Sequence, residues 1–198
     1  AEQRIAILTS GWPYRPGRRY LTLDDLAPVD EPGRMALRLQ RREVTFWEAH
    51  AGMAAHYSSN GQHAAAIKEG RALVKAYPLG WRSHQVLAQA LISAGQYNAA
   101  LQPLKQSLSL KENAYAYKSI GTIFLRNREV QQAIPYLEKA VVLEPNDHRS
   151  RYNLSGAYVE TGDIYKAVTQ LEILLAKVPD YPNARRLYEY LRTQIGNQ

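Results

Sequence analysis

Few residues of this chain have the types and spacing that chemistry needs. His50 and His84 stand at matching places of a repeated segment, and two imidazoles without a third ligand make a poor metal site. We therefore expect both histidines to pack in the interior. Asp24 and Asp25 are adjacent carboxylates, but they lie in a segment without a histidine, so we expect them to cap a turn.

Other catalytic patterns are absent from the sequence. With 0 cysteines, the chain can form no disulfide, no cysteine zinc site and no thiol nucleophile. The sequence has neither a G-x-S-x-G elbow nor a G-x-x-x-x-G-K-[ST] phosphate loop. We expect no catalytic residue, no bound metal, no cofactor and therefore no enzymatic activity.

The dominant pattern is a repeat of about 34 residues. Four alanines, Ala66, Ala100, Ala133 and Ala167, stand 34, 33 and 34 residues apart. A fixed period in this range indicates one small unit stacked on itself. The repeats so defined are 47–80, 81–113, 114–147 and 148–181.

Each repeat predicts two helices joined by a tight turn. In the first half, a large, a small and a large residue recur at helical spacing, as in Met53, Ala54 and Tyr57. A turn follows, with glycine at positions 61, 95 and 162 but Arg128 in the third repeat, where we expect Asn127 to take the left-handed conformation instead. The second half centres on the alanine, and proline follows it at positions 78, 145 and 179. The second repeat lacks one residue, which we place in its connecting loop.

This pattern resembles the tetratricopeptide repeat, whose W-x2-L-G-x2-Y…A-x3-F…P motif has the same length and order. The tryptophan position departs from the family, because His50, His84, Tyr117 and Arg151 occupy it. The resemblance implies an all-α fold, a right-handed superhelical solenoid of antiparallel helix pairs. Apolar residues at helical spacing after Pro179 predict that residues 182–198 form a C-terminal capping helix.

Residues 1–46 do not follow the repeat. Loop chemistry dominates there, and the segment is too small to fold alone. It is predicted to be either an irregular arm that packs along the array, anchored by Trp12 and Tyr14, or the end of an upstream domain. The chain starts at Ala1, which fits a processed exported protein as well as a piece of a longer one.

The resemblance also implies a binding groove lined by the first helices of the repeats. The residues placed there are polar, basic or aromatic, and the predicted partner-binding set is Arg82, Gln85, Gln89, Tyr115, Lys118, Thr122, Arg126, Arg149, Tyr152 and Asn153. Basic and amide groups around aromatic faces suit an extended peptide with acidic or carboxylate groups. Lys118 and Asn153 also match part of the clamp with which some family members hold a C-terminal carboxylate, the next clamp positions falling near Arg186.

The leading hypothesis is therefore a non-catalytic protein–protein interaction module or scaffold. The alternative is a regulatory or assembly domain appended to an enzyme whose catalytic domain lies upstream, and self-association through an exposed flank is a further possibility. The net charge of +7 is spread along the chain without a long basic run, so we expect no nucleic-acid partner. No apolar run approaches the roughly 20 residues of a membrane span, and a cytoplasmic and an exported location both stay open.

Overall fold

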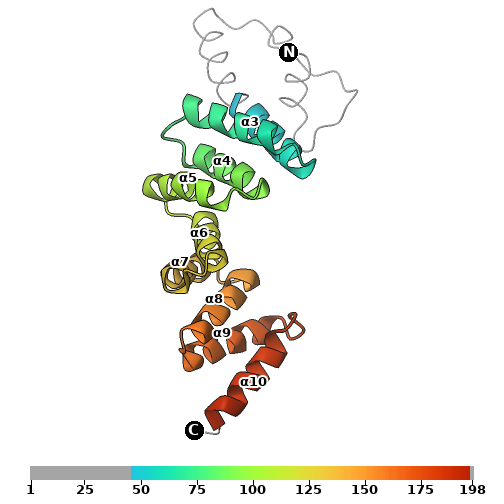
Figure 1. The fold of residues 1–198 in the computed structure, drawn as a ribbon, viewed down its shortest axis with the longest axis vertical. Helices are drawn as coiled ribbons and strands as arrows, with labels where there is room; N and C mark the ends of the chain where they lie inside the picture. The colour runs from blue at the N-terminus through green and yellow to red at the C-terminus, as the bar shows by residue number, and fades with distance from the viewer. Residues whose placement is uncertain (1–45, 197–198) are drawn as a thin grey trace, which may run out of the picture. The chain divides into compact units, whose positions relative to one another are not determined.

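The computed structural model describes residues 46–196, which form helices joined by short turns and contain no strand (Figure 1). Trp12, Tyr14, Asp24 and Asp25, to which the sequence analysis assigned roles, lie outside the described residues. The helices are one over residues 46–59, α3 (His63–Ala76), α4 (Trp81–Ser93), α5 (Tyr97–Leu110), α6 (Ala114–Arg126), α7 (Val130–Leu143), α8 (His148–Glu160), α9 (Ile164–Lys177) and α10 (Ala184–Gly196). In this part of the chain, no helix is long and apolar enough to cross a bilayer.

The described residues divide into two compact halves, one up to Pro103 and the other from Leu104 onward. In the N-terminal half, α3 packs against α4. A Cβ atom on Gly70 of α3 would lie 2.8 Å from the Cα atom of Leu87 in α4, so the two backbones meet where a side chain would not fit. This contact explains why the first repeat has glycine where the other three have leucine.

In the C-terminal half, each helix from α6 to α10 packs against the next one along the chain, as Figure 1 shows from yellow to red. Ala133 and Ala167 are fully buried on α7 and α9, as are Ala66 and Ala100 in the other two repeats. The periodic alanine is therefore confirmed as a core position. Leu137 and Leu171, one turn later, have 0% exposure as well.

The turns between the two helices of each repeat use a left-handed residue. Gly61, Gly95 and Gly162 have φ angles of 72°, 73° and 82°. In the third repeat the expectation for Asn127 is wrong: Asn127 is right-handed with φ −78°, and Arg128 itself has φ 63°. The position in the turn decides which residue is left-handed. The backbone amide of the residue after it must hydrogen-bond to a carbonyl group at the end of the preceding helix, and this requires a left-handed residue at that position.

The second helices end shortly before the periodic prolines. α3, α7 and α9 each end two residues before Pro78, Pro145 and Pro179. The missing residue of the second repeat is confirmed in its loop, because three residues join α5 to α6 whereas four join α7 to α8.

A side chain of the following helix then bonds to the carbonyl oxygen of each proline. Arg151 and Arg185 donate to Pro145 and Pro179 at 3.1 and 3.2 Å, and His84 Nε2 lies 2.8 Å from the Pro78 oxygen. His84 and Arg151 stand where the family has tryptophan. Polar side chains at this position thus tie the loop to the helix that follows it.

Candidate interaction surface

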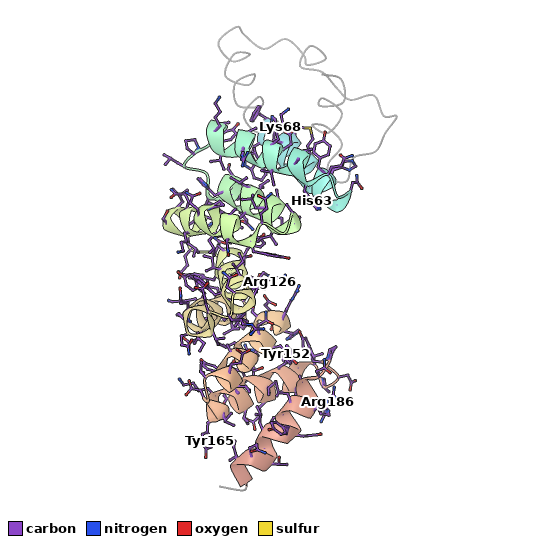
Figure 2. The ribbon with its side chains drawn as sticks, in the orientation of Figure 1. His63, Lys68, Arg126, Tyr152, Tyr165 and Arg186 are labelled. Carbon is purple, nitrogen blue, oxygen red and sulfur yellow. The ribbon has the colours of Figure 1, made fainter. Side chains whose placement is uncertain are left out.

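The predicted groove residues of the C-terminal half lie on the first helices of its repeats, α6 and α8. Figure 2 shows Arg126 of α6, Tyr152 of α8 and Arg186 of α10 along one side of this half, with Tyr165 of α9 on the other side. These three residues of the first helices point to the same side in this view, and we call the surface of α6, α8 and α10 on this side the first-helix face. On these helices Arg126, Arg149 and Arg186 are exposed, and Tyr115, Lys118, Thr122, Tyr152 and Asn153 are half-buried; that the predicted residues line one groove stays a prediction.

Lys118 already has partners within the chain. Its ammonium group lies 3.3 Å from Asp147 and 3.4 Å from Glu144, both in the segment that joins α7 to α8. Burial alone would lower the pKa of Lys118, but the charges of Asp147 and Glu144 outweigh it and raise that pKa. The lysine stays charged, and these two carboxylates neutralise its charge.

Asp147 caps the start of α8 while it holds Lys118. Its Oδ1 accepts hydrogen bonds from the backbone amides of Arg149 and Ser150, and its Oδ2 accepts one from the Ser150 hydroxyl. Burial favours the protonated carboxyl, yet the bonds from Ser150 and the charge of Lys118 keep the pKa of Asp147 below its usual value. The carboxylate is therefore an integral part of the α6–α8 junction.

An aromatic pair lies next along this face. The rings of Tyr152 and Tyr181 have centroids 5.3 Å apart and are tilted by 42°. Tyr181 lies in the segment between α9 and α10, and sequence reasoning missed it. The repeat could have indicated this residue. Tyr181 precedes α10 at the same position of the repeat at which Asn113 and Asp147 cap α6 and α8.

Two arginines belong to the elements that carry the tyrosine pair or follow it. The guanidinium of Arg149 acts on the Tyr181 hydroxyl and lowers its pKa, although burial, Tyr152 and Asp147 raise it more. Arg186, in the first turn of α10, donates a hydrogen bond of 3.1 Å to the Asn183 side chain. The region presents the Arg149 guanidinium near the tyrosine pair and a second exposed guanidinium, that of Arg186, on the next first-type helix.

Tyr115 of α6 is more enclosed. Burial raises the pKa of Tyr115 to about 12, and a hydrogen bond with Ser119 acts in the opposite direction. The phenol is therefore neutral at any physiological pH and can donate a hydrogen bond.

The other three predicted groove residues belong to the N-terminal half, on α4. Arg82 is exposed, with its guanidinium 5.1 Å from the centre of the Trp81 ring. Gln89 donates to Ser93 at 3.4 Å, and Gln85 is half-buried. Their participation in a groove with α6 and α8 stays a prediction.

The two aligned histidines are buried, as expected. His50 bonds to Glu69 of α3 through Nδ1 and stacks on Phe46, whereas His84 bonds to the Pro78 carbonyl. Each imidazole thus has its own partner. Across residues 46–196, no three histidine and carboxylate side chains gather as a metal ion would require.

Two family models match parts of the chain. A tetratricopeptide-repeat model matches residues 124–191, and the model of the bacterial transcriptional activator domain matches residues 23–113. Among curated proteins, the chain is 31% identical over 103 residues to bacteriophage adsorption protein A of Escherichia coli (strain K12), and 29% identical over 72 residues to the Hsp70-Hsp90 organising protein of Plasmodium falciparum. These matches cover 52% and 36% of this chain but only 10% and 29% of those proteins.

Solved structures share the fold. A MamA protein superposes with a TM-score of 0.69 at 22% identity, covering 76% of this chain and 83% of that one. YrrB, described as a tetratricopeptide-repeat protein with an unusual peptide-binding site, gives 0.69 at 18% identity over 82% and 85% of the two chains. A thermophilic repeat protein from Thermus thermophilus gives 0.58 at 22% identity over 82% and 92%.

The stacked helix pairs and the exposed first-helix face define a helical-repeat interaction module. The family model over residues 124–191, the structural neighbours and the periodic residues agree on its kind: the described helices have the fold of tetratricopeptide repeats.

Proposed function

We propose that the chain is a non-catalytic module that holds an extended peptide or partner segment on its first-helix face. The observation that carries the proposal is the Tyr152–Tyr181 pair with Arg149 beside it. Aromatic rings supply contact area at low conformational cost, and guanidinium groups supply paired hydrogen bonds to carboxylates.

Two relatives support a binding role. YrrB carries a peptide-binding site on the same fold, and the name of the Plasmodium protein describes an organiser of two other proteins. A scaffold or adaptor role for this chain is in keeping with both. The partner is bound through a surface, so no catalytic group is needed.

Capture of a partner from a lysate of the source organism tests this proposal. The variant Arg149→Glu with Arg186→Glu reverses two exposed charges on the first-helix face, and we expect it to lose the captured protein. The matched control, Lys105→Glu with Lys139→Glu, reverses two exposed charges on the second helices α5 and α7 and should capture normally. Helical circular dichroism should be the same for all three proteins. Equal capture by both variants would disprove the role of the first-helix face.

A further inference from the structure

We propose that the segment bound on the first-helix face carries a side-chain carboxylate next to an aromatic side chain, and that Arg149, Tyr152, Tyr181 and Arg186 hold it. We call these four residues the tyrosine–arginine site. This inference rests on the proposed function and names the chemistry of the partner.

Lys118 is not the group that recognises the carboxylate. It forms ion pairs with Asp147 and Glu144, and Asp147 also holds Ser150 and the start of α8. An incoming carboxylate would have to compete with two carboxylates that already pair with Lys118, one of which, Asp147, is also hydrogen-bonded to Ser150. We therefore place the binding of the ligand carboxylate one repeat further along the chain, on α8 and α10.

The aromatic half of the ligand is indicated by the tyrosine pair. Tyr152 and Tyr181 come from two different elements, α8 and the segment before α10, and both rings stay half-exposed although they contact each other. A flat side chain packs on such tilted rings in the arrangement that aromatic groups prefer. Because burial raises the pKa of the Tyr181 hydroxyl, this group remains protonated and can donate to a backbone carbonyl or a carboxylate.

The acidic half is indicated by the two arginines. Arg149 and Arg186 are exposed and lie on the successive first-type helices α8 and α10, Arg149 acts on the Tyr181 hydroxyl, and Arg186 is hydrogen-bonded to a neutral amide rather than to a carboxylate. A guanidinium binds a carboxylate through two parallel hydrogen bonds, which a lysine does not. The site is thus complementary to a peptide with acidic side chains on both sides of one aromatic residue.

The experiment uses the full chain and defined peptides, acetylated and amidated so that they have no terminal charge. The probe is Gly-Glu-Phe-Glu-Gly, and the comparison peptides are Gly-Glu-Ala-Glu-Gly and Gly-Lys-Phe-Lys-Gly. A fourth peptide, Gly-Gly-Phe, is acetylated but keeps its C-terminal carboxylate. Titrations followed by NMR amide shifts give the affinity and locate the bound peptide on the chain.

We expect the probe to shift the amides of residues 149–152 and 181–186, and to bind at least about tenfold more tightly than any other peptide. Arg149→Gln should weaken the probe by about tenfold, whereas the control Lys139→Gln on α7 should leave its affinity unchanged. Lys118→Gln should change the affinity less than about twofold.

Two results would overturn the inference. Equal binding of the four peptides would show that the site does not require an acidic and an aromatic side chain in the same ligand. Preferred binding of the peptide with the free C-terminus, abolished by Lys118→Gln, would place recognition at Lys118 instead. Either result, together with loss of partner capture by the Arg149→Glu and Arg186→Glu variant, would refute the ligand chemistry while the proposed function stood; retained capture would refute the function itself.

Discussion

The ammonium group of Lys118 in α6 lies 3.3 Å from the carboxylate of Asp147, the residue that caps α8. This pair joins the first helices of two successive repeats, which contact each other far less than each contacts α7. It also gives a predicted ligand-binding lysine a partner within the chain. The consequence for stability depends on the pH at which Asp147 ionises.

The first prediction concerns that pH dependence. The pKa of Asp147 is lower in the folded chain than its ordinary value of 3.8, despite the opposing effect of burial. The stabilising contribution is therefore complete above about pH 4, the unfolded pKa, and is lost as the pH falls through the lower folded value. Asp147→Asn keeps the helix cap but removes the charge, so it should lower the free energy of unfolding by about 0.5–1 kcal/mol at pH 7. Urea unfolding at pH 7 and pH 3 should show this difference shrinking at the lower pH.

The control for Asp147 is Asp163, which precedes α9 but accepts no capping hydrogen bond from it. Asp163→Asn should have a smaller effect at pH 7. A destabilisation by Asp147→Asn that grows toward pH 3 would show that the sign of the pKa shift is wrong.

The second prediction concerns the contact of Gly70 with Leu87. A methyl group at Gly70 would meet backbone at 2.8 Å, which cannot move without separating α3 from α4. Gly70→Ala should lower the free energy of unfolding by about 1–3 kcal/mol, the usual cost of overpacking. Gly156 of α8 gives the matched control, because a Cβ atom there has nothing within 4 Å. Gly156→Ala should stabilise by about 0.5–1 kcal/mol through helix propensity, and urea unfolding of the two variants should give opposite signs.

The third prediction concerns Arg128, which has φ 63° at an exposed turn position. A side chain in this conformation costs roughly 1–2 kcal/mol, and glycine avoids this cost. Arg128→Gly should therefore raise the free energy of unfolding by about 1 kcal/mol, measured by urea unfolding. Arg126→Gly, in the last turn of α6, should lower it instead, since glycine disfavours the helix. Destabilisation by both variants would mean that the turn does not need a left-handed residue.

The fourth prediction concerns Arg151, which is 7% exposed. Its guanidinium donates to Gln170 at 2.8 Å and to the Pro145 carbonyl at 3.1 Å. The two bonds come from two nitrogens of one planar fork, which the single nitrogen of lysine does not reproduce, so Arg151→Lys should cost about 1–2 kcal/mol in thermal or urea unfolding. Arg149→Lys, two residues earlier and exposed, should change stability by less than about 0.5 kcal/mol. An equal effect of both substitutions would show that the buried bonds of Arg151 contribute nothing.

Much of the fold could be predicted because equivalent positions of a short repeat make equivalent contacts. Each helix pair meets its neighbours through the same places, so four copies of one pattern identified the buried alanines, the glycine turns and the loop deletion. The exception at Arg128 was misassigned because residue preference favoured asparagine, whereas the position in the turn decided the conformation.

The candidate site could be predicted only in part. Helical periodicity placed Tyr152, Arg149 and Lys118 on first helices, but charge alone could not tell a free cation from a paired one. The acids that bind Lys118 lie 26 and 29 residues later, in a loop whose approach depends on how α6, α7 and α8 pack. The predicted self-association stays a prediction.

The sequence by itself therefore determined the period, the helix pairs and the face on which each side chain lies, because these follow from local helical geometry. The tertiary structure alone decided which neighbours those side chains meet. It placed the ring of Tyr181 against that of Tyr152, and it paired the ammonium group of Lys118 with the carboxylate of Asp147. Such pairings depend on the angles at which helices pack, and a distance of a few ångströms separates a neutralised charge from one that a partner can reach.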